Sequence, residues 1–223
     1  MSVLTGLFDS FDNLDQIAVL DIARWIKHAP NEVVLENYLA NKILYPQTLP
    51  LTKEDTELDL AILREALRAN GPKNLAKTGS FLGDNTFLNV TLRKILIPSR
   101  FLRFVPSLTA LIWAFIDAFL LERERKDFFE DLWTITLTGE IDEVVGSVLL
   151  PQFSDRNGVL ELTQGSQSYK IRFGSLMIIP CPLNRCQIVY KFNKGKILGK
   201  QESAVEVYGG RIGLFIDARD KKK

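Results

Sequence analysis

The fold class of this chain is decided by the stretch GVLELTQGSQSYKIRFGSLMIIP, residues 158–180. It contains three short runs rich in Val, Ile, Leu, Phe and Tyr, which Gly165 and Gly174 separate from one another. Short apolar runs broken by turn residues are typical of β-strands. Asn157-Gly158 and Gln164-Gly165 have the composition of tight turns between neighbouring strands. The stretch therefore predicts consecutive β-strands.

The same pattern continues on both sides of this stretch. Further apolar runs recur at intervals of roughly 8–12 residues. They are LWTITLT (132–138), VVGSVLLP (144–151), CQIVYKF (186–192), SAVEVYG (203–209) and RIGLFID (211–217). Regularly spaced short strands indicate a small antiparallel barrel or sandwich. We therefore expect residues 128–223 to form an antiparallel β domain.

The front half of the chain has the periodicity of helices. In LDQIAVLDIARWI (14–26) the apolar residues recur near one face of a helix. Asn31 is the expected cap of a second helix over 31–44, which must end before Pro46. Thr52 begins a third helix with capping-box spacing, and Gly71-Pro72 is expected to end it.

The sequence then predicts a loop over 72–90, a strand over 90–98 with a short helix as the alternative, and a core helix over 107–125. The predicted fold class is thus α+β. A mainly helical region, 1–127, precedes the β domain of 128–223.

Charge and hydropathy exclude several classes of protein. Lys and Arg number 28 against 27 Asp and Glu, so nothing suggests the basic excess of a nucleic-acid-binding protein. The apolar stretch 107–121 contains Asp117 and is shorter than the roughly 20 residues of a membrane span. We expect a buried core helix there, with an interfacial membrane helix as the alternative. The first residues carry acids and no basic region, so we expect no signal peptide and a cytoplasmic protein.

Metal-ligating residue types are scarce. The chain has two cysteines, Cys181 and Cys186, and one histidine, His28. A structural zinc site needs about four such ligands, so we expect none. We predict two buried or half-buried free thiols on adjacent strands, with a disulfide as the alternative. His28 precedes Pro30 at a predicted helix end, where a capping role is expected.

The sequence motifs of common enzymes are missing, including the P-loop, the dinucleotide fingerprint, the nucleophile elbow and the kinase set.

The glycines of 209–213 lie between two predicted strands, so we expect a hairpin or bulge with left-handed backbone. Asp117 should pair with an arginine or a backbone donor, and Asp217 with Arg219, because a buried carboxylate needs a partner. The sequence therefore assigns no catalytic, cofactor-binding or metal-binding residue and implies no cofactor.

Several segments, taken in order, carry a family resemblance. LENYLANKILYPQTLPLTKEDTELDLAILREALR (35–68) combines a helix, a loop with two prolines and an acidic helix ending in REALR. A valine-rich β-region follows in VVGSVLLP (144–151), YKIRFGSLMIIPCP (169–182) and VEVYGGRIGLFIDAR (205–219). In this order they resemble the C-terminal portion of the MutL/GlmL family, the actin-like ATPases associated with glutamate mutase.

The chain departs from that family where the family binds nucleotide. The family's actin-like lobe carries D-x-G-S-T and D-x-G-G phosphate loops, and this chain has neither. Where the family has a glycine-rich adenosine turn, this chain has Pro98-Ser99-Arg100-Phe101, and only Ser99 matches. Side chains at these positions keep the backbone away from a nucleotide. The resemblance therefore implies a remnant of the actin-like lobe in 1–127, without ATP binding.

The missing phosphate loops favour a non-enzymatic interaction or scaffold protein. One alternative is a chain of a split actin-like ATPase, acting as chaperone or reactivator for a cobalamin-dependent mutase or similar client. The other is a small-molecule enzyme with a cleft lined by acids. For the first two we expect a protein partner or a homo-oligomer. An exposed apolar face is expected on the helix with Trp113, Phe115 and Phe119, or on the front helices with Trp25, although each of these aromatics taken singly is expected to be buried in the chain's own core.

Overall fold

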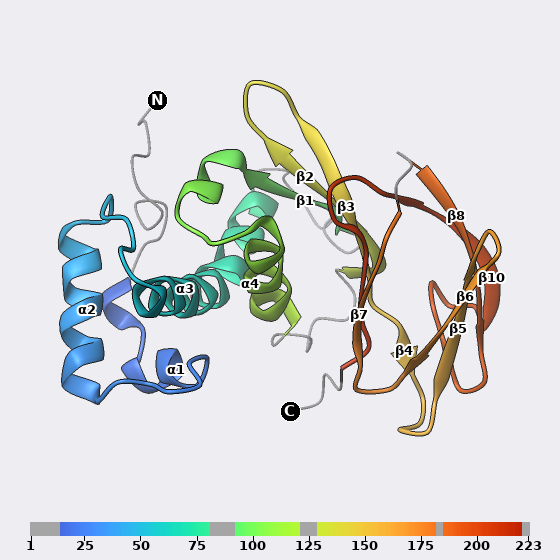
Figure 1. The fold of residues 1–223 in the computed structure, drawn as a ribbon, viewed down its shortest axis with the longest axis horizontal. Coiled ribbons are helices and arrows are strands. Elements are labelled where there is room, and N and C mark those ends of the chain that lie inside the picture. The colour runs from blue at the N-terminus through green and yellow to red at the C-terminus, as the bar shows by residue number, and fades with distance from the viewer. Residues whose placement is uncertain (1–13, 81–91, 121–128, 182–184, 220–223) are drawn as a thin grey trace. The chain divides into compact units, whose positions relative to one another are not determined.

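The computed structural model describes residues 14–80, 92–120, 129–181 and 185–219 (Figure 1). The chain divides into two units. The first comprises Met1–Phe87 and Arg100–Glu124, and the second comprises Leu88–Ser99 and Arg125–Lys223. The chain therefore passes between the units more than once. Residues 88–99, which lie inside the predicted helical region, belong with the β-strands.

The first unit is built from helices. They are η1 (Leu14–Gln16), α1 (Val19–Ala23), α2 (Glu32–Leu44), α3 (Lys53–Ser80) and α4 (Leu108–Leu120), with η3 (Ser99–Arg103) at the junction with the second unit. The helix α3 packs against both α1 and α4. The predicted caps are confirmed: the Asn31 side chain accepts the Val34 N–H at 3.0 Å. Thr52 and Asp55 each accept the other's backbone N–H at 3.0 Å, which completes a capping box at the start of α3.

The prediction of one continuous helix over 14–26 is wrong. Ala18 has an extended backbone, with φ −68° and ψ 131°, and this separates η1 from α1. The helix α1 ends at Ala23, and Trp25 lies in the turn that follows, from which its indole reaches Glu65 on α3. This tertiary contact outweighs the local helical periodicity. His28 consequently lies in an exposed turn and does not cap a helix end as predicted.

The predicted end of the third helix at Gly71-Pro72 is also wrong, because α3 continues to Ser80. A proline disfavours helical backbone at the preceding residue partly through a clash with that residue's Cβ, and Gly71 has no Cβ. The predicted loop over 72–90 is therefore helical up to residue 80, and its remainder lies outside the described residues.

The second unit contains a five-stranded sheet in the order β1-β2-β3-β11-β7, a four-stranded sheet in the order β10-β8-β5-β6, and the pair β4-β9. The strands of the five-stranded sheet are β1 (Leu92–Pro98), β2 (Phe129–Thr138), β3 (Glu143–Leu149), β11 (Gly213–Asp217) and β7 (Leu176–Ile179). The others are β10 (Glu202–Tyr208), β8 (Arg185–Phe192), β5 (Val159–Gln164), β6 (Gln167–Arg172), β4 (Gln152–Phe153) and β9 (Gly195–Lys196). Every predicted apolar run, including 90–98, contributes a strand.

The prediction of a purely antiparallel domain is wrong, because β1 pairs with β2, and β3 with β11, in parallel. Parallel neighbours need a long crossover, which residues 99–128 supply for the first pair. Such pairings join segments distant in sequence, so the local pattern does not reveal them. The sheets are also not closed into a barrel.

Both larger sheets contribute to one apolar core. In β8 buried and exposed residues alternate strictly, which places Cys186, Ile188, Tyr190 and Phe192 inside. They pack with Leu149 on β3 and with other buried side chains. Those are Leu160, Leu162, Ile171, Ile179, Cys181, Ile197, Val207, Leu214, Ile216 and Ala218.

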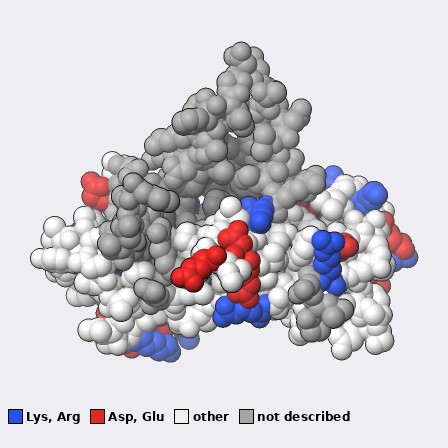
Figure 2. Space-filling view, turned by 90° about the horizontal axis from the view of Figure 1, so that it is seen from above, with Lys and Arg blue, Asp and Glu red and all other residues white. Residues whose placement is uncertain are grey.

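The exposed face of the four-stranded sheet carries opposite charges on neighbouring strands. Lys170 on β6 pairs with Glu161 on β5 at 3.1 Å, and Lys191 on β8 pairs with Glu202 on β10 at 3.2 Å. On the face seen in Figure 2, acidic and basic side chains lie close to one another. Interspersed charges of both signs are typical of a solvated face.

Three glycines lie where backbones approach one another closely. A Cβ on Gly146 of β3 would lie 2.6 Å from the Gly213 carbonyl oxygen, and one on Gly213 would lie 2.4 Å from that of Ile179. Gly210 and Gly213 have φ of 116° and 85°, so the predicted left-handed backbone is confirmed. The segment 209–213 connects β10 of one sheet to β11 of the other, however, and is not a hairpin.

Candidate functional site

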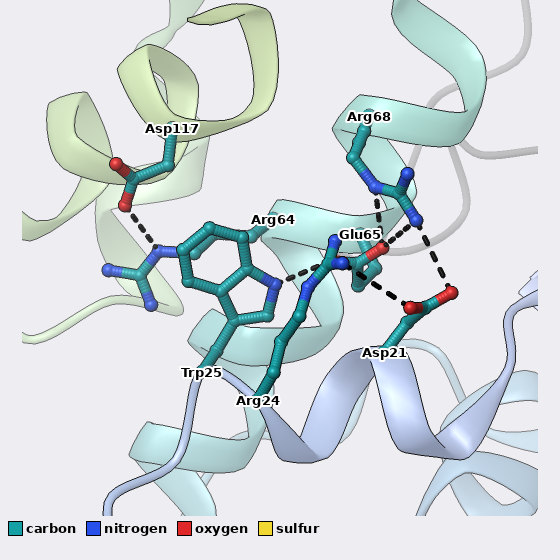
Figure 3. Close-up of polar contacts among 7 residues, drawn as sticks. All are labelled: Asp21, Arg24, Trp25, Arg64, Glu65, Arg68 and Asp117. Atoms are coloured by element: carbon teal, nitrogen blue, oxygen red, sulfur yellow. Dashed lines mark hydrogen bonds and ion pairs between the residues drawn. The ribbon is translucent and has the colours of Figure 1, made fainter. Parts of the chain in front are cut away.

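A group of charged side chains in the helical unit joins α1, α3 and α4 (Figure 3). We call it the arginine–carboxylate network. Its members are Asp21, Arg24, Trp25, Arg64, Glu65, Arg68 and Asp117. They come from three separate parts of the sequence, and the packing of α3 against α1 and α4 brings them together.

Glu65 is the centre of this network. Its side chain is 1% exposed and accepts hydrogen bonds from Arg24 Nη2 at 2.6 Å, from Arg68 Nε at 2.8 Å and from the Trp25 indole. A buried carboxylate is stable only with such donors. Asp21 adds a second carboxylate to both arginines, at 3.4 Å from Arg24 and 3.3 Å from Arg68.

The Trp25 ring connects Glu65 to a further ion pair. The guanidinium carbons of Arg24 and Arg64 both lie 5.3 Å from its ring centroid, within cation–π range. Arg64 Nε also donates to Asp117 Oδ2 at 3.1 Å. The predicted pairing of Asp117 is therefore confirmed, and it joins α4 to α3.

The arginine–carboxylate network balances its own charge, since three arginines meet three carboxylates. An anionic ligand would have to displace Asp21 or Glu65 from guanidiniums that already form close bonds to them. The arrangement is therefore best suited to holding α1, α3 and α4 together.

A second buried charged group lies between α2 and α3. Lys42 Nζ donates to Asp59 Oδ2 and to the Thr48 carbonyl, both at 2.9 Å, and the Tyr38 hydroxyl donates to Asp59 Oδ1 at 2.9 Å. Burial raises the pKa of the Asp59 carboxyl, although the Lys42 ammonium opposes this. Burial and the Asp59 carboxylate likewise raise the pKa of Tyr38. The Lys42 and Asp59 side chains are only 5% and 1% exposed, so a substrate has no direct access to them.

The helix α2 and the loop after it expose large apolar side chains, which together we call the α2 surface. Its members are Val33 (63% exposed), Val34 (47%), Ile43 (39%), Leu44 (69%), Tyr45 (55%), Leu49 (55%) and Leu51 (91%). The inward side of the same helix buries Leu35 and Leu39.

The exposed apolar face was expected on the front helices or on the helix with Trp113, and α2 is one of those front helices. Phe115 is buried, and Trp113 and Trp25 are half-buried. The side chain of Phe119 lies outside the described residues. The helical phase of 31–44 could have indicated the α2 surface, because Val33 and Leu44 fall opposite Leu35 and Leu39.

The prediction of two free thiols is wrong, because Cys181 and Cys186 form a disulfide with a Cα–Cα distance of 6.4 Å. Cys181 follows β7 and Cys186 lies on β8, so the bond joins the two larger sheets directly. Both cysteines are buried, as predicted. The cytoplasmic location stays a prediction, and structural disulfides are rare in that compartment.

Asp217 and Ser99, which the sequence analysis also considered, both contact other parts of the fold. Asp217 is fully buried and accepts from the Arg219 Nε and Nη2 at 3.0 Å, which confirms the predicted pair. Ser99 follows β1, and its hydroxyl lies against Gly139 in the turn between β2 and β3. The C-terminal Lys221–Lys223, expected from the sequence to be a solvated tail, and the charged segment 122–126, expected to be the solvent-exposed end of the core helix, lie outside the described residues.

Within the described ranges, no three His, Cys, Asp or Glu side chains gather in a way that could hold a metal ion. The helices of those ranges are too short or too polar to cross a membrane. No protein-family model, curated protein or solved structure matches the chain. The resemblance to the MutL/GlmL family therefore stays a prediction from the sequence.

Proposed function

We propose that this chain is a non-enzymatic interaction or scaffold protein, and that it binds a protein through the α2 surface. The observation that carries the proposal is the exposure of seven large apolar side chains on one helix and the loop after it. Single exposed apolar residues are common on monomers, but a group of them indicates an interaction site.

The two sides of α2 support this assignment. Leu35 and Leu39 already attach the helix to the rest of the unit, so the outward residues are not required for the core. Leu44 and Tyr45 at its C-terminal end are more than half exposed. Aromatic and aliphatic side chains of this kind form the buried centre of protein–protein interfaces.

The charged groups favour a structural role over catalysis. Glu65 and Asp59 carry the most buried carboxylates of the helical unit, and each is bonded to cations of the same unit. A general acid or base needs to reach a substrate proton within hydrogen-bond distance. These carboxylates instead attach helices to one another.

A comparison of surface variants tests the proposal. The wild-type chain, Leu44→Glu and the control Ile141→Glu would be purified from cells at native expression level, with their bound proteins quantified. Ile141 is 86% exposed and lies between β2 and β3. It belongs to the second unit, whereas α2 belongs to the first. We expect the same protein to be retained by the wild type and by Ile141→Glu, and lost from Leu44→Glu.

Two results would contradict this function. One is equal retention by all three proteins, which would show that the α2 surface binds nothing. The other is micromolar binding of ATP to the purified chain in a calorimetric titration. A retained partner that carries the D-x-G-S-T loops would instead favour the split actin-like ATPase.

A further inference from the structure

Four exposed residues form a stripe along α2: Val33, Asn37, Ala40 and Leu44. Their spacing of four, three and four residues places them along one side of a helix, opposite the buried Leu35 and Leu39. All four are exposed, and the two large ones are 63% and 69% exposed. Apolar residues at this alternating spacing are typical of a seam between two packed helices.

We propose that a second copy of this chain packs its own α2 antiparallel against this stripe. This proposal rests on the proposed function, for which it names the partner. The spacing is the same when counted from either end of the helix. A two-fold axis between Asn37 and Ala40 therefore superposes the stripe on itself, with Val33 of each copy against Leu44 of the other.

Asn37 is the residue that selects a second copy as partner. A side-chain amide both donates and accepts hydrogen bonds, so it can pair with an identical group near a two-fold axis. A single asparagine in a helical seam is known to specify register and oligomeric state. Against a purely apolar partner the same amide would be buried without a hydrogen bond, which disfavours that complex. Ala40 is small and leaves space beside the amide.

The charges favour the antiparallel arrangement. Glu32 and Glu36 both lie in the N-terminal half of α2 and are exposed. A parallel pair would place the acidic halves of the two copies side by side. The antiparallel pair separates them and also aligns the two helix dipoles favourably.

The available area indicates a weak dimer. The helix α2 has 13 residues, and with the loop up to Leu51 it exposes apolar surface on the order of several hundred Å². A standard interface takes about 800 Å² from each partner, so the area falls at or below that size. We therefore expect dissociation in the micromolar range.

Sedimentation equilibrium over roughly 1–100 µM tests the inference, because weak interfaces of this size dissociate in that range. The variants are Asn37→Lys, which places two like charges beside the axis, and Asn41→Lys, at another exposed asparagine that lies at the rim of the stripe. We expect a monomer–dimer equilibrium for the wild type. Asn37→Lys should lower the association constant at least about tenfold and Asn41→Lys less than about threefold, since central positions dominate interface energy and rim positions contribute little.

A wild-type chain that is monomeric at every concentration would overturn the inference, and so would a dimer that Asn37→Lys leaves unchanged. Neither result alone removes the proposed function. If the partner captured in the preceding experiment is still lost from Leu44→Glu, only self-association fails. If capture is also unaffected, both proposals fail. Circular dichroism of each variant establishes that its helices are intact.

Discussion

At the scale of single residues, Leu198 is the one described non-glycine residue with left-handed backbone, at φ 50°. It forms a two-residue turn with Gly199, whose φ is 78°, and Ile197 and Lys200 close the turn with two hydrogen bonds of 2.9 Å. The buried Asp131 carboxylate accepts the Leu198 N–H at 2.7 Å and so holds this conformation in place. A left-handed L-residue costs about 1–2 kcal/mol, and asparagine tolerates the conformation better than leucine.

We therefore expect Leu198→Asn to raise the free energy of unfolding by about 1 kcal/mol, measured by urea denaturation. The control is Leu49→Asn, at a similarly exposed leucine whose φ is not positive, which should change stability by less than about 0.5 kcal/mol. A loss of stability in Leu198→Asn would show that contacts of the leucine side chain stabilise the fold by more than its left-handed backbone costs.

At the scale of elements, α2 is attached to α3 by the buried pair of Lys42 and Asp59. Removal of one partner leaves an uncompensated buried charge, so Lys42→Met should cost about 3–5 kcal/mol. The double variant Lys42→Met/Asp59→Leu removes both charges and should recover most of that loss. Chemical denaturation of the two single variants and the double variant measures this. A double variant as unstable as Lys42→Met would show that the ion pair is net stabilising.

The loss in Lys42→Met should also depend on pH. Without the ammonium, nothing from Lys42 opposes the rise in the Asp59 pKa that burial causes. The folded state then binds the proton more tightly than the unfolded state, whose carboxyl has a pKa of about 3.9. Stability of the variant relative to wild type is therefore lowest at neutral pH and recovers as the pH falls toward that value. A deficit that is constant between pH 7 and pH 5 would contradict this.

At the scale of the whole molecule, the units are interleaved in sequence, since α4 belongs with α3 although β1 lies between them. Leu111, Ile112 and Ile116 of α4 are at most 1% exposed. Removal of residues 1–80 deletes α3 and should leave this apolar helix without its cover. We expect the truncated chain to bind a hydrophobic dye strongly, unlike the full-length chain, because the apolar side chains of α4 are then exposed. A truncated chain that binds no more dye than the full-length chain would show that α3 does not cover α4.

The parts of the fold that could be predicted are those with a local cause. Alternating residues and turn glycines such as Gly165 located the strands, and Asn31 and Thr52 located helix starts through their caps. The failures have non-local causes. Trp25 leaves the helical path to reach Glu65, and β1 finds its parallel partner β2 across a long crossover. The pairs of Asp117 and Asp217 were foreseeable because a buried carboxylate needs a cation, whereas the α2 surface required knowing which side of the helix is buried.

The close approach at Gly146, Gly210 and Gly213 bears on how relatives of this chain can be recognised. Any side chain at these positions would collide with main-chain atoms, which cannot rotate away as a side chain can. Surface charges such as Lys170 and Glu161 can be exchanged during evolution at little cost, but these three positions cannot. A distant relative should therefore keep this glycine triplet, in the same order among apolar strands, long after the rest of its sequence has diverged.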